Sequence, residues 1–120
     1  MLKFKSDMIS NASFRKFALS FAEATEQPHW ENPSFRVRKK IFATLREKES
    51  RAVVKLNAVD QNVFCAFDKN VIYPVPGGWG KQGWTFIELK KVKASLCRDA
   101  VTTSYCAVAP KKLAEPYRTA

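Results

Sequence analysis

Long apolar segments are missing from the sequence. No uninterrupted apolar run exceeds five residues, the length of the run at residues 105–109, whereas a membrane-spanning helix needs about 20. Residues 1–7 carry positive charge, but no apolar stretch follows them, which argues against a secretory signal peptide. These absences predict a soluble protein of the cytoplasm that does not contact a membrane.

Residues that commonly hold metals or act as nucleophiles are few. The chain has one histidine, His29, and three cysteines, Cys65, Cys97 and Cys106, none of them in a CxxC pair. An odd number of separated thiols argues against an extracellular disulfide framework, and a structural zinc site needs four converging ligands. The cysteines stand beside apolar or small residues, so we expect three reduced, buried thiols and no metal or other cofactor.

The sequence also lacks paired carboxylates suited to acid–base catalysis. Asp60, Asp68 and Asp99 fall on predicted helices, and Glu88 is alone in its predicted strand. General acid–base chemistry needs at least one such group poised in a cleft beside its partner. We therefore predict that the protein is not an enzyme.

Acidic residues are scarce relative to basic ones. Lysine and arginine total 21 against 11 aspartates and glutamates, for a formal charge of +10, which favours phosphate-rich partners. The alternative is a solvated sheet face whose lysines protect its edges. Because four positive charges crowd a predicted hairpin without an intervening acid, we favour phosphate binding. The candidate nucleic-acid-binding residues are Arg36, Arg38, Lys39, Lys40, Lys55, Lys81, Lys90 and Lys91.

Hydrophobic periodicity predicts a single α+β domain over residues 1–120. Apolar residues make up 46% of the chain, and their spacing alternates between helical and strand patterns. The expected architecture has two layers, a five-stranded antiparallel sheet with helices packed on it, in the order α-β-β-β-α-β-β-α. Helices are predicted at residues 13–24, 58–68 and 92–109, and strands at residues 34–38, 41–46, 51–56, 71–74 and 84–89.

Several local features complete this prediction. Ser13 is expected to cap the first helix, and residues 25–33, with two prolines, are typical of a loop that carries His29 and Trp30. In the second helix, a stripe at helical spacing is expected to face the core. That stripe comprises Val59, Val63, Phe64 and Phe67.

All four glycines lie in residues 77–83, which predicts a flexible loop. Residues 78–83 match GxGxxG, but the segment opens a strand, whereas a dinucleotide-binding motif opens a helix. The loop nonetheless carries Trp79, Lys81 and Trp84, which are suited to grip a stacked base or a phosphate. The alternative is a hairpin connection whose tryptophans pack on the sheet. We favour packing for Trp84 and leave both roles open for Trp79.

Several spaced segments of the sequence follow one known family pattern in order: residues 35–43, 52–56, 84–89, 104–105 and 109–113. Positions that match the recurrent pattern are Lys40, Phe42, Lys55, Trp84 and Lys111. In these segments the sequence resembles the MmcQ/YjbR-like family of small bacterial proteins. The resemblance implies a fold similar to type III secretion chaperones, and DNA binding, because the family's shape is similar to a double-wing motif. It implies no catalytic residues.

These observations predict a non-catalytic nucleic-acid-binding domain. Its basic hairpin is expected to contact the phosphates of DNA weakly and with little sequence preference. The alternative is a protein-interaction or chaperone-like module that uses an exposed sheet face or the loop around Trp79. One continuous basic face would favour nucleic acid, and a large apolar groove would favour a protein partner.

Overall fold

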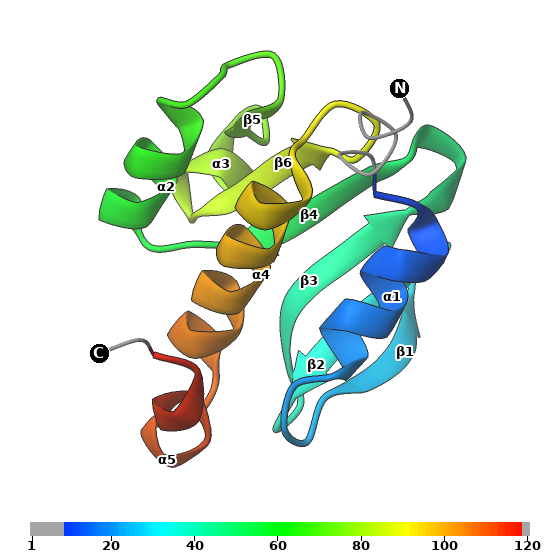
Figure 1. Ribbon diagram of the computed structural model, residues 1–120, viewed down its shortest axis with the longest axis vertical. Coiled ribbons are helices and arrows are strands. Elements are labelled where there is room, and N and C mark those ends of the chain that lie inside the picture. Colours follow the sequence, from blue (N-terminus) through cyan, green and yellow to red (C-terminus); the bar gives the residue numbers. More distant parts are fainter. Residues whose placement is uncertain (1–8, 119–120) are drawn as a thin grey trace.

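An antiparallel sheet of six strands organises the chain (Figure 1). The computed structural model describes residues 9–118. In this part of the chain, no helix has the length and apolar character needed to cross a membrane. The strands lie in the order β1-β2-β3-β4-β6-β5. They are β1 (Thr25–His29), β2 (Asn32–Val37), β3 (Lys40–Arg46), β4 (Arg51–Lys55), β5 (Ile72–Pro74) and β6 (Trp84–Glu88).

Strand β1 was not expected from the sequence. It occupies Thr25–His29, within the predicted loop, and pairs only with β2, so it forms one edge of the sheet. All five of its residues are exposed, and consequently no alternation of apolar and polar residues marks it. Pro28 is tolerated because an edge strand needs fewer backbone donors. The predictions of five strands and of the order α-β-β-β-α-β-β-α were therefore wrong.

Five α-helices accompany the sheet in the described residues. The first begins two residues earlier than predicted, because the side chain of Ser10, not Ser13, accepts the capping hydrogen bond from the backbone N–H of Ser13. It also ends at Leu19 rather than residue 24. The helices are α1 (Asn11–Leu19), α2 (Ala58–Cys65), α3 (Gly78–Lys81), α4 (Ala94–Val108) and α5 (Lys111–Ala114).

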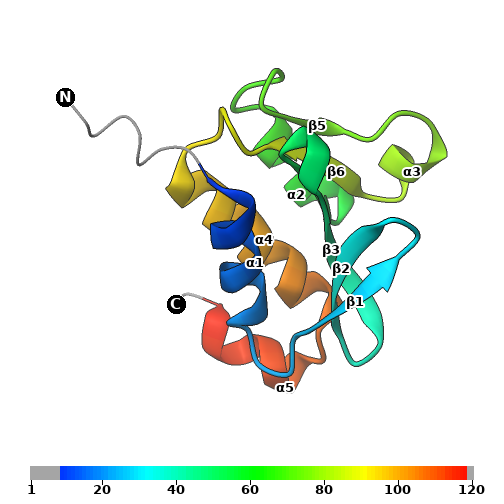
Figure 2. The same ribbon diagram turned by 90° about the vertical axis from the view of Figure 1, so that its right-hand side faces the viewer.

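Helices α1 and α4 pack on one face of the sheet and enclose the core (Figure 2). Tyr105 of α4 stacks on Phe21 with 4.6 Å between ring centres and meets Phe42 of β3 edge-on. The buried hydroxyl of Ser104 donates to the carbonyl of Phe42 at 2.6 Å and accepts from the backbone N–H of Lys55 at 3.0 Å. Through these contacts α4 holds β3 and β4 together.

Helix α2 does not bury its predicted apolar stripe. Val59, Val63 and Phe67 are 71%, 52% and 65% exposed, and only Phe64 of the predicted set packs against the core. The side chain of Asn57 caps the helix by accepting a hydrogen bond from the backbone N–H of Asp60. Gln61 joins the helix to its neighbours by donating to the carbonyl of Gly80 at 3.0 Å and to the hydroxyl of Thr85 at 3.1 Å. The helical spacing was right, but the inference that this stripe faces the core was wrong.

The glycine segment contains a helical turn that the loop prediction did not include. This turn is α3, and the backbone of the segment passes close to two neighbouring segments. A Cβ at Gly80 would lie 2.0 Å from the carbonyl oxygen of Val75, and one at Gly83, where φ is 106°, would lie 1.9 Å from that of Leu56. Gln61 of α2 also donates to the carbonyl of Gly80 at 3.0 Å. These contacts define the position of the backbone that carries Trp79.

The second face of the sheet, which we call the open face, lies away from α1 and α4. The β1–β2 turn and α3 border it (Figure 2). A register shift between Phe35 and Arg36 of β2 lets both Phe42 and Ala43 point into the core, while Ile41 and Thr44 point to the open face. Cross-strand pairing places on this face Arg36, Ile41, Thr44, Arg46, Arg51, Val53, Lys55, Tyr73, Trp84, Phe86 and Glu88.

Candidate functional site

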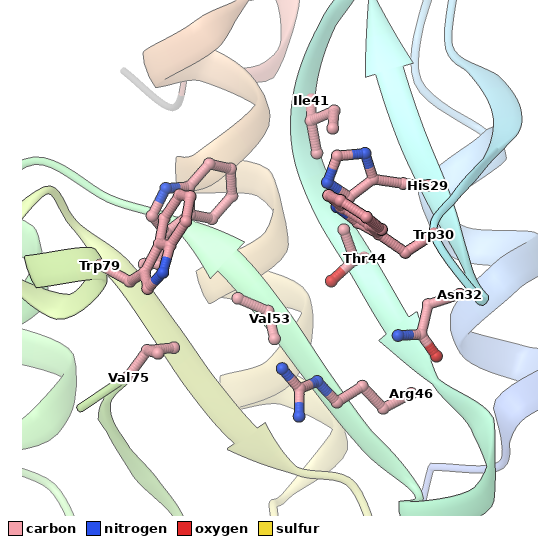
Figure 3. A pocket seen from close by; sticks show the side chains of 10 residues that line it. His29, Trp30, Asn32, Ile41, Thr44, Arg46, Val53, Val75 and Trp79 are labelled. Atoms are coloured by element: carbon pink, nitrogen blue, oxygen red, sulfur yellow. The ribbon is translucent and has the colours of Figure 1, made fainter. Parts of the chain in front are cut away.

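A groove of about 290 Å³ lies on the open face between the β1–β2 turn and α3 (Figure 3). All three tryptophans of the chain line it. Its volume is near the lower end of the range for small-molecule sites, roughly 300–1,000 Å³. The lining residues are His29, Trp30, Asn32, Ile41, Thr44, Arg46, Val53, Val75, Trp79 and Trp84.

Trp30 forms one side of the groove from the β1–β2 turn. Its backbone has a φ of 61°, and its side chain is 89% exposed. A bulky residue in the left-handed region is uncommon and costs free energy, so glycine or asparagine would suit this turn better. Beside it, the ring of His29 lies edge-on with 6.1 Å between ring centres. Trp30 therefore exposes a large apolar side chain to solvent, and its backbone adopts an uncommon conformation that costs free energy.

The opposite side of the groove carries the other two tryptophans. Trp79, on α3, is 63% exposed, and Trp84, at the start of β6, is half-buried. Trp84 packs on the sheet as its strand position predicted, yet its ring also lines the groove. The ammonium of Lys55 lies 5.0 Å from the centre of that ring, within the range of a cation–π contact.

Two arginines flank the ring of Phe86 on the floor of the open face. The guanidinium carbons of Arg46 and Arg51 lie 5.2 Å and 4.9 Å from the ring centre. Arg51 donates to Glu88 at 3.0 Å, and the hydroxyl of Tyr73 donates to the same carboxylate. Partial burial and the carboxylate of Glu88 both raise the pKa of Tyr73. The charge of Arg51 is thus compensated locally.

Two other cations on this face have no acidic partner. Within residues 9–118, neither Arg36 nor Lys55 forms an ion pair. The guanidinium of Arg36 donates instead to the hydroxyl of Ser34 at 3.0 Å, and Arg36 lies opposite Ile41, a lining residue, in the β2–β3 ladder. The groove therefore combines exposed aromatic rings with uncompensated positive charge.

Comparison with known proteins identifies the family. The model of the YjbR family matches residues 19–107. The chain belongs to the YjbR family. The crystal structure of protein DR2400 from Deinococcus radiodurans, with domain DUF419, has the same fold, with a TM-score of 0.76 over 92% of this chain and 89% of that one. The two sequences are 17% identical, so this likeness concerns the fold alone. No curated protein matches.

The predicted basic hairpin of this YjbR-family chain carries less uncompensated charge than its sequence suggested. Arg38 and Lys39 occupy the β2–β3 turn with φ values of 51° and 71°, and Lys40 begins β3. Glu23, fifteen positions before Arg38, accepts from its guanidinium at 2.6 Å and 3.2 Å. The hydrogen bonds that Arg38 donates lower the pKa of Glu23. One of the four clustered charges is therefore compensated.

The remaining predicted contact residues of the YjbR-family chain lie apart. Lys81, on α3, lines a different hollow together with Pro74 and Gly77. Lys90 and Lys91 follow the end of β6 that pairs with the start of β4, so they lie at the opposite end of the sheet from the β2–β3 turn. Only Arg36 and Lys55 of the predicted set border the groove on the open face.

The thiols of the YjbR-family chain lie away from the groove. Cys97 and Cys106 are buried on α4, on the opposite face of the sheet from His29. Burial raises the pKa of Cys97 to about 12, and it also raises the pKa values of Cys65 and Cys106. Among the described residues, no three histidine, cysteine or acidic side chains cluster as metal ligands do.

Proposed function

We propose that this protein binds nucleic acid without catalysing a reaction, and that its open face is the contact surface. The predicted basic residues do not form one continuous face, so the proposal rests on the groove, on which three tryptophans converge beside two cations without acidic partners. Nucleic acids present negative phosphates and planar bases together. An open sheet face with cations and aromatic rings complements both features.

Charge supplies the affinity in this proposal. The chain carries a formal charge of +10, and each phosphate contact releases condensed counterions. Arg36 and Lys55 contribute phosphate contacts beside the groove, and Lys39 and Lys40 extend them along the neighbouring β2–β3 turn. Phosphate contacts carry no sequence information directly, so binding shows little sequence preference. Without base-specific contacts, the affinity stays in the weak range of non-specific binding.

A second candidate function uses another surface. Three apolar side chains of α2 and the residues after it, Val59, Val63 and Phe67, are mostly exposed at a spacing of four residues. Such a stripe is suited to pack against a protein partner. This favours a protein-interaction module, as the chaperone-like fold also does. It is the second choice because α2 carries no charge pattern that selects a partner.

The test is a titration of labelled DNA at several salt concentrations. The doubly substituted variant Arg36→Gln/Lys55→Gln is compared with Lys111→Gln/Lys112→Gln on α5, where both lysines are exposed and do not line the groove. On a duplex, log affinity falls with log salt by about 0.9 per contact, so the first variant should flatten the slope by roughly 1.8. The α5 variant should match the wild type. Absence of binding at low salt would refute the proposal.

A further inference from the structure

We infer that the groove accepts unpaired bases, so that the protein prefers single-stranded nucleic acid over a duplex. Trp30 and Trp79 are the stacking residues, and they lie on opposite sides of the groove (Figure 3). This inference rests on the proposed function and adds the state of the strand and the mode of contact. It does not depend on the order of bases, because every base has an aromatic face.

The exposure of the two indoles is the first argument. Trp30 is 89% exposed and Trp79 is 63% exposed, while the aromatic residues Phe14, Phe35 and Phe42 are at most 1% exposed. An aromatic side chain left in water loses a large favourable burial term, so two such rings on one groove indicate a ligand that covers them. In a duplex the faces of the bases are already stacked on one another. An unpaired strand offers those faces to the protein.

The backbone that carries both rings supplies the second argument. Trp79 stands on α3, which is held by the close approach of Gly80 to Val75 and by the hydrogen bond from Gln61. Trp30 stands in a turn between two paired strands, at a φ of 61°. Preformed sites lose less conformational freedom on binding. The strain at Trp30 is accordingly maintained at a position where it presents the indole to the groove.

The positive charge beside the groove favours a nucleic-acid strand over a peptide as its ligand. A proline-rich peptide also docks on aromatic grooves, but it does not need the uncompensated cations beside this one. Lys55 lies over the ring of Trp84, and Arg36 lies opposite the lining residue Ile41. Arg46 also lines the groove, but it pairs with Glu49 at 3.7 Å. Lys55 and Arg36 therefore provide the positive border for a phosphate backbone whose bases turn toward the rings. A single strand uses both features, and an uncharged peptide uses only one.

The experiment compares a labelled single-stranded oligonucleotide of about ten nucleotides with the matching duplex. Variants Trp30→Ala and Trp79→Ala should each weaken single-strand binding by roughly 5- to 150-fold, the effect of losing one stacked base. Their duplex affinity should stay within about twofold of the wild type, because phosphate contacts remain. Trp30→Phe should retain most of the affinity, since it keeps an aromatic face. Phe67→Ala, an exposed aromatic outside the groove, is the matched control.

The outcomes separate this inference from the proposed function. Equal affinity for both forms, with no effect of the tryptophan variants but a flattened salt slope in Arg36→Gln/Lys55→Gln, would overturn the inference and leave the proposed function standing. Loss of all nucleic-acid binding at low salt in the wild type would refute both. Tryptophan fluorescence that responds to an uncharged proline-rich peptide, but not to the single strand, would assign the groove to a peptide and overturn the inference.

Discussion

Lys55 and Trp84 face each other across the β4–β6 ladder, and the ammonium of Lys55 lies 5.0 Å from the centre of the Trp84 ring. The pair fixes a positive charge at the wall of the groove without neutralising it. A carboxylate at the same place would hold the lysine equally well but would cancel its charge. The side chain is therefore positioned and still available to an anion.

Removing this charge should affect binding more than stability. In Lys55→Met the apolar stem is retained and the cation–π contact is lost, so the free energy of unfolding should fall by no more than about 0.5–1 kcal/mol. The salt dependence of DNA binding should lose about one contact, roughly 0.9 in slope on a duplex. Urea unfolding and a salt titration measure the two effects. A large loss of stability with an unchanged slope would assign Lys55 to the fold alone.

The close backbone approach at Gly83 predicts a strong effect of a single methyl group. Gly83→Ala should destabilise the protein by at least about 1–3 kcal/mol, because of its positive φ. The carbonyl oxygen of Leu56 blocks the methyl group, and the hydrogen bond between Leu56 and Gly83 holds both backbones in place. Gly78→Ala is the control, since nothing lies within 4 Å of its Cβ position. Urea unfolding should show little change there, and equal losses in both variants would contradict this account.

The buried hydroxyl of Ser104 should be important for stability. In Ser104→Ala the backbone N–H of Lys55 and the carbonyl of Phe42 lose a partner, and a buried polar group left unsatisfied costs about 1–3 kcal/mol. Thr102→Ala is the comparison, because that exposed hydroxyl bonds only to a carbonyl one turn earlier in its own helix. Thermal unfolding should separate the two variants clearly. Similar melting temperatures would show that β3 and β4 do not depend on this bridge.

Thiol reactivity should follow burial. With a pKa of about 12, Cys97 stays protonated at pH 7 to 9 in the folded protein and should react very slowly with an alkylating reagent. Cys65, which is half-buried, should react first even though its pKa is also raised. Mass spectrometry of timed samples measures the order, and in denaturant all three thiols should react. Rapid labelling of Cys97 in the native protein would contradict its placement in the core.

Much of the fold follows from periodicity, and the exceptions have physical causes. Strands β2 to β4 and helix α4 bury alternate or helically spaced apolar residues, so their sequences reveal them. Strand β1 buries none, because it lies at an edge with both sides in water, and so it gives no such signal. The apolar stripe of α2 has the right period, but periodicity does not show what a stripe faces.

The candidate site was predictable only in part. The sequence groups Trp79, Trp84 and Lys81 because they are close in the chain, and the structure retains the two tryptophans in the groove. Trp30 joins them only through the β1–β2 hairpin, and that pairing could not be foreseen without β1. The sequence did not reveal the ion pair between Arg38 and Glu23, because the fold alone brings these two residues together.

The position of Pro28 determines where the sheet stops. The two-residue turn makes His29 and Asn32 the hydrogen-bonded pair at the end of the hairpin, so the next pair, Pro28 and Pro33, directs its backbone nitrogens outward. Pro28 therefore removes a donor from the free side of β1, where its neighbours are the polar side chains of residues 25–27 and 29. A strand from another molecule would find an interrupted ladder and, apart from Pro28, only polar side chains along β1, so this edge disfavours aggregation by strand addition.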